Sequence, residues 1–471
     1  MNVAAPFSLL WQNAGNADQE AVFSADSTIE SYLAAERALA LAQGSLGVIP
    51  QDYADQIVKV AVLENIDREQ LWKDARNVGY PILGLVRQIS AHLPEGPNGR
   101  VHYGATTQDI MDTGLALQMA RSLELLDVQL DRLGAALAAR IAEYRTTVMP
   151  GRTHAQQAVP TTFGATLSTL LDQLRRQRER LQAAHARISV ISLYGAGGTN
   201  AAEGPQSSQI RARMAEILGV SDAVVPWHVD RDLLSEYGWV CAQICGTIAK
   251  FGRNIVDLSR TEVGEVFEPF NSHRGASSTM PQKVNPISSE LMIGIAVVTG
   301  SLTSALVRIQ EAGHERAAGE WQAEWFLVPQ FGCLAGASID CAIEVAEGMR
   351  VDQDRMRKNL ELDGGLIMAE AMMIQLAPAM GREHAHDVVY EACERARSTH
   401  RVLQDVMHEV AQEKGIADLM PKHLLTADEY VGEALAIADT ATAAWNANLP
   451  LSPSVALDKL AVVSVAVSAE R

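Results

Sequence analysis

The sequence predicts an all-α protein in which a long central helical bundle lies between smaller helical domains at the N and C termini. Proline breaks helix interiors, and none occurs over residues 227–268, 287–328 or 330–377. Apolar residues recur at the three- and four-residue spacing of a helix face. Alternating β-branched residues bounded by tight turns, which are typical of strands, are scarce throughout. These observations favour helices long enough to fill most of the proline-free intervals.

The clearest amphipathic pattern consists of apolar residues that step by three or four, with charged residues between them: Leu123, Leu126, Leu130, Leu133, Leu137 and Ile141. This spacing predicts a helix of at least about five turns. A similar leucine-rich face predicts a second long helix within residues 161–191. We expect an N-terminal domain over residues 1–110, the bundle over 111–355 and a C-terminal domain over 356–471.

The segment of residues 291–307 has no charge, but glycine, serine and threonine dilute its apolar character. A membrane span would need roughly 20 strongly apolar residues. We therefore interpret this segment as a helix buried on all sides by protein, and we expect no membrane partner. Because the apolar helix faces exceed what one chain would easily cover, we also expect homo-oligomerisation through the bundle.

Composition limits the classes of function. The formal charge of −18 and the lack of a Lys/Arg block disfavour binding to nucleic acid. Five cysteines without a Cys-x-x-Cys pair indicate a reduced, cytoplasmic protein without a zinc site, and residues 1–20 are unlike a signal peptide. We interpret the glycine-rich residues 195–204 as a mobile loop, and His384 and His386 as part of a solvated helix face. With no dinucleotide fingerprint or metal-spaced cluster, we expect no cofactor and no metal.

The segment that points most strongly to chemistry is RGASSTMPQKVNPISSE, residues 274–290. Asn285 and Pro286 suit the N-cap and the first position of a helix, so Lys283 would lie beside the positive end of a helix dipole, where an anion binds. A serine hydroxyl can act as a base at neutral pH only where a local positive field stabilises its alkoxide. The alternative from the residues alone is a serine-rich turn before a capped helix.

This segment strongly resembles the signature loop of the fumarase/aspartase superfamily, Gly-Ser-Ser-x-Met-Pro-x-Lys-x-Asn-Pro, with Ala276 in place of the glycine. The resemblance implies that Ser277 removes the Cβ proton of the substrate, with Ser278 as a neighbouring contact. It also implies that Lys283 and Asn285 hold a substrate carboxylate. The alanine would stiffen the loop without changing these assignments.

Two further segments resemble regions of the same superfamily and occur in the expected order. The first is VHYGATTQDIMDT, residues 101–113. The resemblance implies that Thr106 and Thr107 bind a carboxylate, with His102 and Asp109 nearby.

The second segment is GRTHAQQAVP, residues 151–160. By resemblance, Thr153 and Gln156 contact the substrate and His154 protonates the leaving group, a task that suits an imidazole because its pKa lies near neutrality. A lone histidine is more often structural. Here, however, the resemblance implies that Glu290 orients His154.

The segments GEVFEP and AGHERAAGEWQAEW look most like the 3-carboxy-cis,cis-muconate cycloisomerase branch of that superfamily, with adenylosuccinate lyase close behind. Arg316 would then grip another carboxylate through two hydrogen bonds. The alternative for Arg316 is a surface ion pair with Glu315 or Glu320.

Typical cycloisomerases of this branch have tryptophan in place of the histidine and lack the glutamate, so His154 and Glu290 favour acid-assisted elimination. The expected reaction is elimination from an N- or O-substituted aspartate- or succinate-like substrate through a carboxylate-stabilised carbanion, which releases fumarate. The alternatives are an epimerase of an N-substituted aspartate such as iminodisuccinate, a 3-carboxy-cis,cis-muconate cycloisomerase, and a non-catalytic structural protein. The resemblance also implies a small dicarboxylate or tricarboxylate ligand and a homotetramer with shared active sites.

Overall fold

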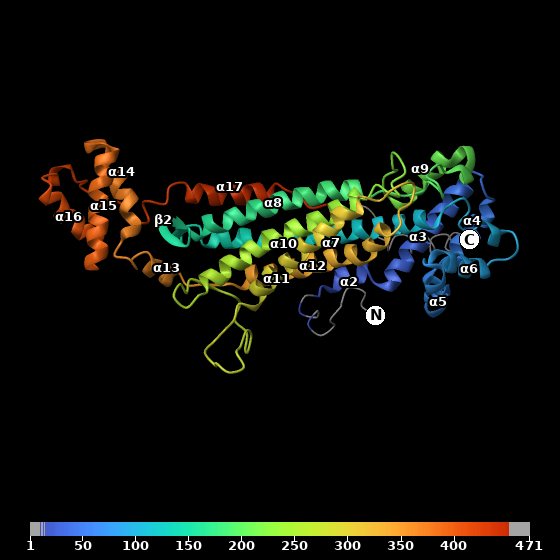
Figure 1. Ribbon diagram of the computed structural model, residues 1–471, viewed down its shortest axis with the longest axis horizontal. Helices are drawn as coiled ribbons and strands as arrows, with labels where there is room; N and C mark the ends of the chain where they lie inside the picture. The colour runs from blue at the N-terminus through green and yellow to red at the C-terminus, as the bar shows by residue number, and fades with distance from the viewer. Residues whose placement is uncertain (1–9, 11–12, 14, 452–471) are drawn as a thin grey trace.

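The computed structural model describes residues 10, 13 and 15–451 of the chain. The molecule is elongated, and a bundle of long helices separates two smaller helical regions (Figure 1). This arrangement confirms the predicted all-α class. The N-terminal region contains α2 (Ala17–Val22), α3 (Ala25–Ser45), α4 (Gln51–Val60), α5 (Arg68–Val78) and α6 (Ile82–Ala91).

The bundle consists of α7 (Thr107–Glu143), α8 (Phe163–Ile188), α10 (Asp232–Leu258), α11 (Ile287–Ile309) and α12 (Glu320–Gly348). The two long helices predicted from apolar spacing are α7 and α8. All six apolar residues predicted on α7 are at most 1% exposed, because their spacing places them on the face that packs against α8 and α12. With 37 residues, α7 is about 55 Å long.

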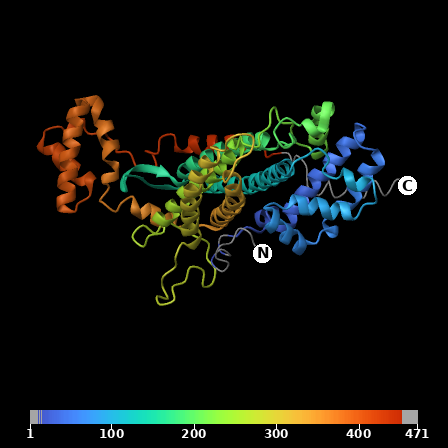
Figure 2. The same cartoon turned by 45° about the vertical axis from the view of Figure 1, so that its right-hand side comes forward.

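The C-terminal region contains α13 (Gln353–Asn359), α14 (Ala369–Met380), α15 (Arg382–Thr399) and α16 (Leu403–Glu413). The last three form a separate apolar core at the end of the bundle opposite to the N-terminal region (Figure 2). Helix α17 (Ala434–Asn446) then returns along the bundle, where it packs against α7 and α8 and buries Trp445. Helix α9 (Ser207–Leu218) follows α8 in sequence but packs against α3 of the N-terminal region.

The remaining regular elements are short. The strands are β1 (Val148–Thr153), β2 (Gln156–Thr162), β3 (Val266–Phe267) and β4 (Arg350–Val351), and the 3₁₀ helices are η2 (Leu63–Asn65), η3 (Pro97–Arg100), η4 (Ala201–Gln206), η5 (Leu366–Met368) and η6 (Ala417–Leu419). Strands β1 and β2 form an antiparallel hairpin that the sequence did not predict. Its two turn residues, His154 and Ala155, have φ of 49° and 63°. Asn and Gly are the usual signals of such a turn, and neither is present.

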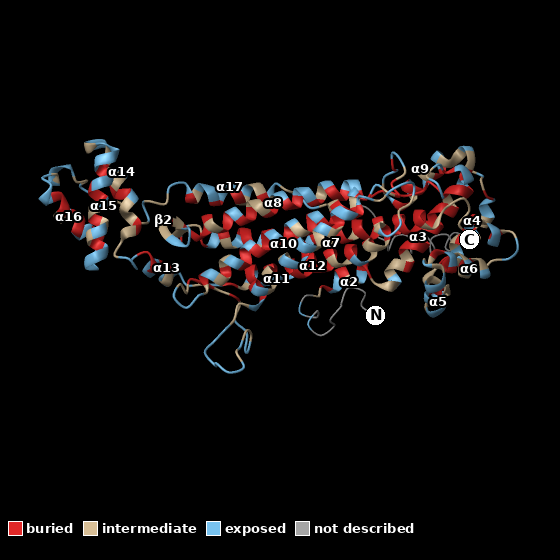
Figure 3. Cartoon of the chain, in the orientation of Figure 1, coloured by how far each residue is buried: buried red, intermediate tan, exposed pale blue. Residues whose placement is uncertain are grey.

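Helix α11 contains the uncharged segment 291–307 and exposes much of it (Figure 3). Two helices, α11 and α12, are long and apolar enough to cross a membrane by length and composition; 72% of the apolar window is buried in α12 but only 22% in α11. The expectation that this segment is surrounded by protein is therefore wrong for α11 within a single chain. Its outer face presents Val297, Val298 and Val307.

Candidate active site

The first candidate subsite lies at the N-terminus of α7. Thr106 is the N-cap of the helix, and its backbone N–H donates to the Asp109 carboxylate at 3.0 Å in a capping box. Asp109 is buried and also accepts the backbone N–H groups of Tyr194 and Gly195, both at 2.9 Å. Nε2 of His228 lies 2.7 Å from the same carboxylate. Segments far apart in the sequence thus converge on the Asp109 side chain, which holds the Thr106 backbone.

The glycine-rich residues 195–204, which we expected to be a mobile loop, are held beside this subsite. Asn200 donates through its backbone to the Tyr194 carbonyl at 2.7 Å and through its side chain to the Leu193 carbonyl at 3.1 Å. Burial alone would raise the pKa of Asp109, but the hydrogen bond and charge of His228 outweigh it and lower that pKa below its ordinary value. Asp109 is therefore ionised at neutral pH, where it accepts hydrogen bonds from the backbone of both segments.

Arg316 lies in the connection between α11 and α12 and reaches this subsite. Its guanidinium donates to Thr106 Oγ1 and to the Ala196 carbonyl, both at 3.3 Å. Its Nε is buried and has no hydrogen-bond partner among the described residues. Arg316 therefore does not form the alternative surface ion pair with Glu315 or Glu320, and it contacts Thr106 instead; its grip on a substrate carboxylate stays a prediction.

His102 approaches the same subsite with a left-handed backbone, φ 58°, and its Nδ1 lies 2.6 Å from Glu36. Burial would lower the pKa of His102, but the charge and hydrogen bond of Glu36 outweigh it and raise that pKa. Glu203 is nearby, and its two carboxylate oxygens accept from the Gln43 amide at 2.9 and 3.0 Å. Burial raises the pKa of Glu203 to about 7. Sequence reasoning missed Glu36, Gln43 and Glu203.

The second candidate subsite is the tip of the β1–β2 hairpin, where Thr153, His154 and Gln156 are exposed. The turn conformation aims these side chains away from the bundle core. The imidazole of His154 makes no hydrogen bond to a described residue, so it is free to meet a substrate or another chain.

The third candidate subsite is a loop between β3 and α11 that projects from the bundle (Figure 1). Ser277 Oγ accepts the backbone N–H of Met280 at 3.1 Å and that of Thr279 at 3.3 Å. The loop closes on itself where the Asn285 N–H donates to the Gly275 carbonyl at 2.8 Å. Gly275 has φ 65°, and an added Cβ would lie 2.3 Å from the Asn285 carbonyl oxygen, so glycine is required there. Ala276 has no positive φ, so its methyl group is accommodated without backbone strain.

The loop begins and ends at one buried carboxylate, Glu268. This side chain accepts the backbone N–H and the hydroxyl of Ser289, both at 2.7 Å, and contacts Arg274 at 3.2 Å. Arg274 is held in turn by Glu344. No local pattern predicts this cluster around Glu268, because its members are up to 76 residues apart.

The start of α11 differs by one residue from its predicted position. The helix begins at Ile287, and Pro286 rather than Asn285 is the N-cap. Pro286 has no side-chain donor or acceptor, and the Asn285 backbone is occupied by Gly275. Lys283 and Ser278 are exposed on the loop, and Glu290 is exposed on the first turn of α11.

One chain does not bring the three subsites together. Thr106 and Thr107 lie at the N-terminus of α7, whereas the His154 hairpin follows its C-terminus, so about 55 Å of helix separates them. Among the described residues, Glu290 also makes no contact with His154. A substrate of a few ångströms cannot span these positions within a single chain.

An elongated helical bundle with a threonine-capped subsite, a histidine hairpin and a projecting serine–lysine loop defines the class of all-helical lyases. The family described as lyase matches residues 13–300, and the family described as adenylosuccinate lyase C-terminus matches residues 365–441. The chain belongs to the fumarase/aspartase superfamily, as its loop predicted.

Comparisons with individual proteins agree with this membership. The chain is 39% identical to 3-carboxy-cis,cis-muconate cycloisomerase of Pseudomonas aeruginosa, over 92% of this chain and 95% of that protein. It is 35% identical to N-acetyl-S-(2-succino)cysteine lyase of Dickeya dadantii, over 91% and 94%. A solved structure of 3-carboxy-cis,cis-muconate lactonizing enzyme from Pseudomonas putida matches with a TM-score of 0.85 and 34% identity, over 93% and 99%. The chain is therefore an enzyme of the lyase and isomerase type.

Proposed function

We propose that this enzyme catalyses β-elimination from an N- or O-substituted aspartate- or succinate-like dicarboxylate, with release of fumarate, and the reverse addition. The observation that carries the proposal is the pair of backbone N–H groups that donate to Ser277 Oγ. Donors fixed on that oxygen stabilise negative charge, which a serine needs in order to act as a base at neutral pH. The nearby Lys283 adds a positive charge to the same loop.

In the proposed reaction, Ser277 Oγ takes the Cβ proton, and the electron pair of the C–H bond forms a carbanion stabilised by the adjacent carboxylate. Lys283, Asn285 and Thr107 share the added negative charge. The electron pair then forms the carbon–carbon double bond as the carbon–nitrogen or carbon–oxygen bond breaks. His154 gives its proton to the departing atom, so that fumarate and a neutral leaving group are formed.

We further propose that each active site is shared between chains of a homotetramer. Two observations support this assembly: the roughly 55 Å between the Thr107 and His154 segments of one chain, and the apolar outer face of α11. Glu290 would orient His154 across such an interface. A hairpin from one chain could then approach the α7 terminus of another.

A second candidate is 3-carboxy-cis,cis-muconate cycloisomerisation, favoured by the 39% identity to a protein of that name. His154 and Glu290 argue against it, because lactone formation needs no acid for a departing amine. An epimerase of N-substituted aspartates would use the same residues and differ only in adding the leaving group back to the opposite face.

The decisive experiment offers the enzyme N-substituted aspartates and 3-carboxymuconate separately and follows both fumarate and muconate absorbance. We expect fumarate release, and we expect Ser277→Ala to lower kcat by about 10²–10⁴-fold. Ser272→Ala, in an exposed serine of the same loop, is the matched control and should retain activity. Loss of muconate absorbance without fumarate from any aspartate would overturn the proposal in favour of cycloisomerisation.

A further inference from the structure

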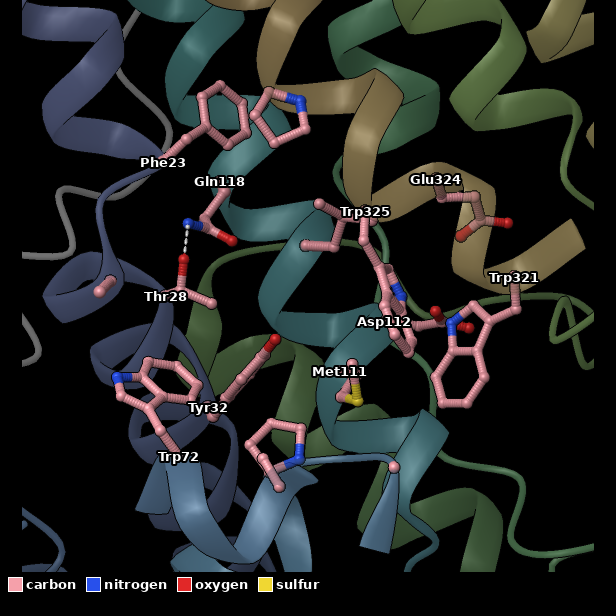
Figure 4. Close-up of a pocket in the computed structure, with 16 residues that line it drawn as sticks. Phe23, Thr28, Tyr32, Trp72, Met111, Asp112, Gln118, Trp321, Glu324 and Trp325 are labelled. Carbon is pink, nitrogen blue, oxygen red and sulfur yellow. Dashed lines mark hydrogen bonds between the residues drawn. The ribbon is translucent and has the colours of Figure 1, made fainter. Parts of the chain in front are cut away.

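A cavity of about 330 Å³ lies where the N-terminal region meets the bundle (Figure 4). Its walls come from α3, α5, α7 and α12 and from the turn before α6, which contributes Gly79 and Pro81. The volume is within the range of small-molecule sites, and a position between two helical regions is common for them. None of the residues assigned above to catalysis or to carboxylate binding lines it.

The cavity is largely aromatic. Trp321 and Trp325 pack edge to face with their ring centroids 5.5 Å apart, and Tyr80 supports Trp321 at 5.0 Å. Trp72, which is 39% exposed, stands on the opposite wall. Figure 4 shows the Tyr32 side chain pointing into the space between these walls. An apolar or aromatic group would find ring faces on both sides.

Two polar groups in the wall make no hydrogen bond to a described residue. Nε1 of Trp325 is buried and has no hydrogen-bond partner among the described residues. The Tyr32 hydroxyl makes no hydrogen bond to a described residue, and burial, followed by the charge of Asp112, raises its pKa, so it stays neutral. The Tyr32 hydroxyl can donate to a neutral acceptor on a bound molecule.

The charge of the cavity wall excludes anions. Asp112 and Glu324 both line it and both bind the buried guanidinium of Arg231, at 3.0 and 2.6 Å. Burial raises the pKa of Glu324, and the trio carries a charge of −1 or zero depending on its protonation, never a positive one. No lysine or arginine is among the lining residues. A phosphate or carboxylate entering here would lose its hydration without gaining a counter-ion.

The cavity and the threonine subsite share one face of α7. Thr107, Met111 and Leu115 are spaced by four and so share one face of α7, and the last two line the cavity. Side chains four residues apart on a helix are about 5–6 Å from each other. On the opposite side, Trp321 follows Arg316 by five residues. A dicarboxylate held by Thr107 and Arg316 would therefore have its substituent beside the mouth of the cavity.

We propose that this aromatic cavity receives the substituent of the substrate, and that the leaving group is an amine bearing an apolar or aromatic group without an anionic charge. This inference rests on the proposed lyase activity, whose substrate class it narrows. It disfavours iminodisuccinate, whose substituent carries two carboxylates. Trp325 and Trp72 are the specificity-determining residues, and the Tyr32 hydroxyl donates a hydrogen bond to a polar atom of the amine substituent.

The test compares fumarate release from three matched substrates: N-(2-phenylethyl)aspartate, N-methylaspartate and N-(2-carboxyethyl)aspartate. We expect kcat/KM to be at least about tenfold higher for the phenylethyl compound than for the other two. Trp325→Ala should remove this preference by lowering kcat/KM for the phenylethyl compound at least about tenfold. Tyr390→Ala, in an exposed aromatic residue of α15, is the control and should preserve the preference.

Two further measurements keep the inference falsifiable. If Trp325→Ala does not fold, Trp72→Ala at the partly exposed wall replaces it and should give the same loss. Calorimetric titration of 2-phenylethylamine into the inactive Ser277→Ala enzyme, with fumarate present, tests the cavity without turnover, and binding should weaken at least about tenfold when the tryptophan substitution is added.

The outcomes separate the two proposals. Fumarate release at equal rates from all three compounds, or a preference for the carboxyethyl compound, would overturn the inference and leave the lyase function standing. No fumarate from any of them would overturn the lyase function. In that case, 2-phenylethylamine binding that depends on Trp325 would still support the cavity, and no binding would overturn it as well.

Discussion

The Asp109→Asn substitution tests whether one buried carboxylate organises the candidate carboxylate subsite. Asp109 is fully buried and accepts the backbone N–H groups of Thr106, Tyr194 and Gly195 as well as the Nε2 contact of His228. An asparagine replaces one acceptor oxygen with an NH₂ group, which sets donor against donor at that position. Hydrogen bonds to a charged group contribute about 1.5–3 kcal/mol each, and breaking a buried ion pair costs about 3–5 kcal/mol. We therefore expect a loss of about 3–5 kcal/mol in the free energy of unfolding at pH 7.

The stability lost in Asp109→Asn should also depend on pH in a defined direction. The pKa of Asp109 is lowered in the folded protein, so its contribution to stability is present above the unfolded value of about 3.9 and is lost as pH falls through the folded pKa. The difference between wild type and Asp109→Asn should thus be full at pH 7 and should shrink below about pH 4. Urea unfolding followed by circular dichroism at several pH values measures this difference.

The matched control is Asp439→Asn, which removes an exposed carboxylate paired with Arg145. Such surface pairs contribute little, so the urea midpoint should not change measurably. An Asp109→Asn enzyme within about 1 kcal/mol of wild type at pH 7, or a difference independent of pH, would refute the central role of this carboxylate.

Three further predictions follow from the site and its surroundings. Mixing inactive Ser277→Ala and His154→Ala enzymes after partial denaturation should restore activity, because some shared sites then receive both native residues; no recovery would argue against sharing. Val297→Arg places a charge on the α11 face that is 63% exposed in one chain, and light scattering should show a smaller assembly with activity lost in parallel. Burial raises the pKa of Glu203 to about 7, so ionisation costs stability as pH rises above the unfolded value; Glu203→Gln should be more stable than wild type by about 1–2 kcal/mol at pH 8 and equal to it below about pH 4.5. Thermal melts measure this difference, and a stability difference between Glu203→Gln and wild type that is the same at pH 8 and pH 4.5 would contradict the prediction for Glu203.

Much of the bundle was predictable because, in a long helix, the residues that pack against the core recur every three or four positions in the sequence. Leu123 and Leu130 of α7 are fully buried, and any residue three or four positions along shares their environment. The β1–β2 hairpin could not be predicted in this way. His154 and Ala155 adopt positive φ in its turn, although Asn and Gly are the residues that usually occupy such positions. Helix α17 was also hidden, because its buried Trp445 packs on α8 from more than 250 residues away.

In the candidate site, too, some residues could be predicted from the sequence and others could not. The loop around Ser277 could be recognised because its residues are contiguous, and its oxygen does accept two backbone donors. The partners that hold the threonine subsite could not be recognised, because His228 lies 119 residues from Asp109 and Glu203 lies 160 from Gln43. No local pattern joins such positions, and only the folded backbone brings them within hydrogen-bond distance.

The length of α7 also determines when an active site can exist. A single chain can fold its bundle core and its Asp109 cluster, since these contacts lie within one chain. Thr107 begins the same helix and the His154 hairpin follows its other end, so the folding of one chain does not bring these two residues together. Under the proposed sharing of sites, catalysis depends on association, and specific activity should fall on dilution through the dissociation constant of the assembly while helical content stays constant. A specific activity independent of concentration in a demonstrably monomeric sample would mean that one chain closes the 55 Å separation, which a rigid 37-residue helix forbids.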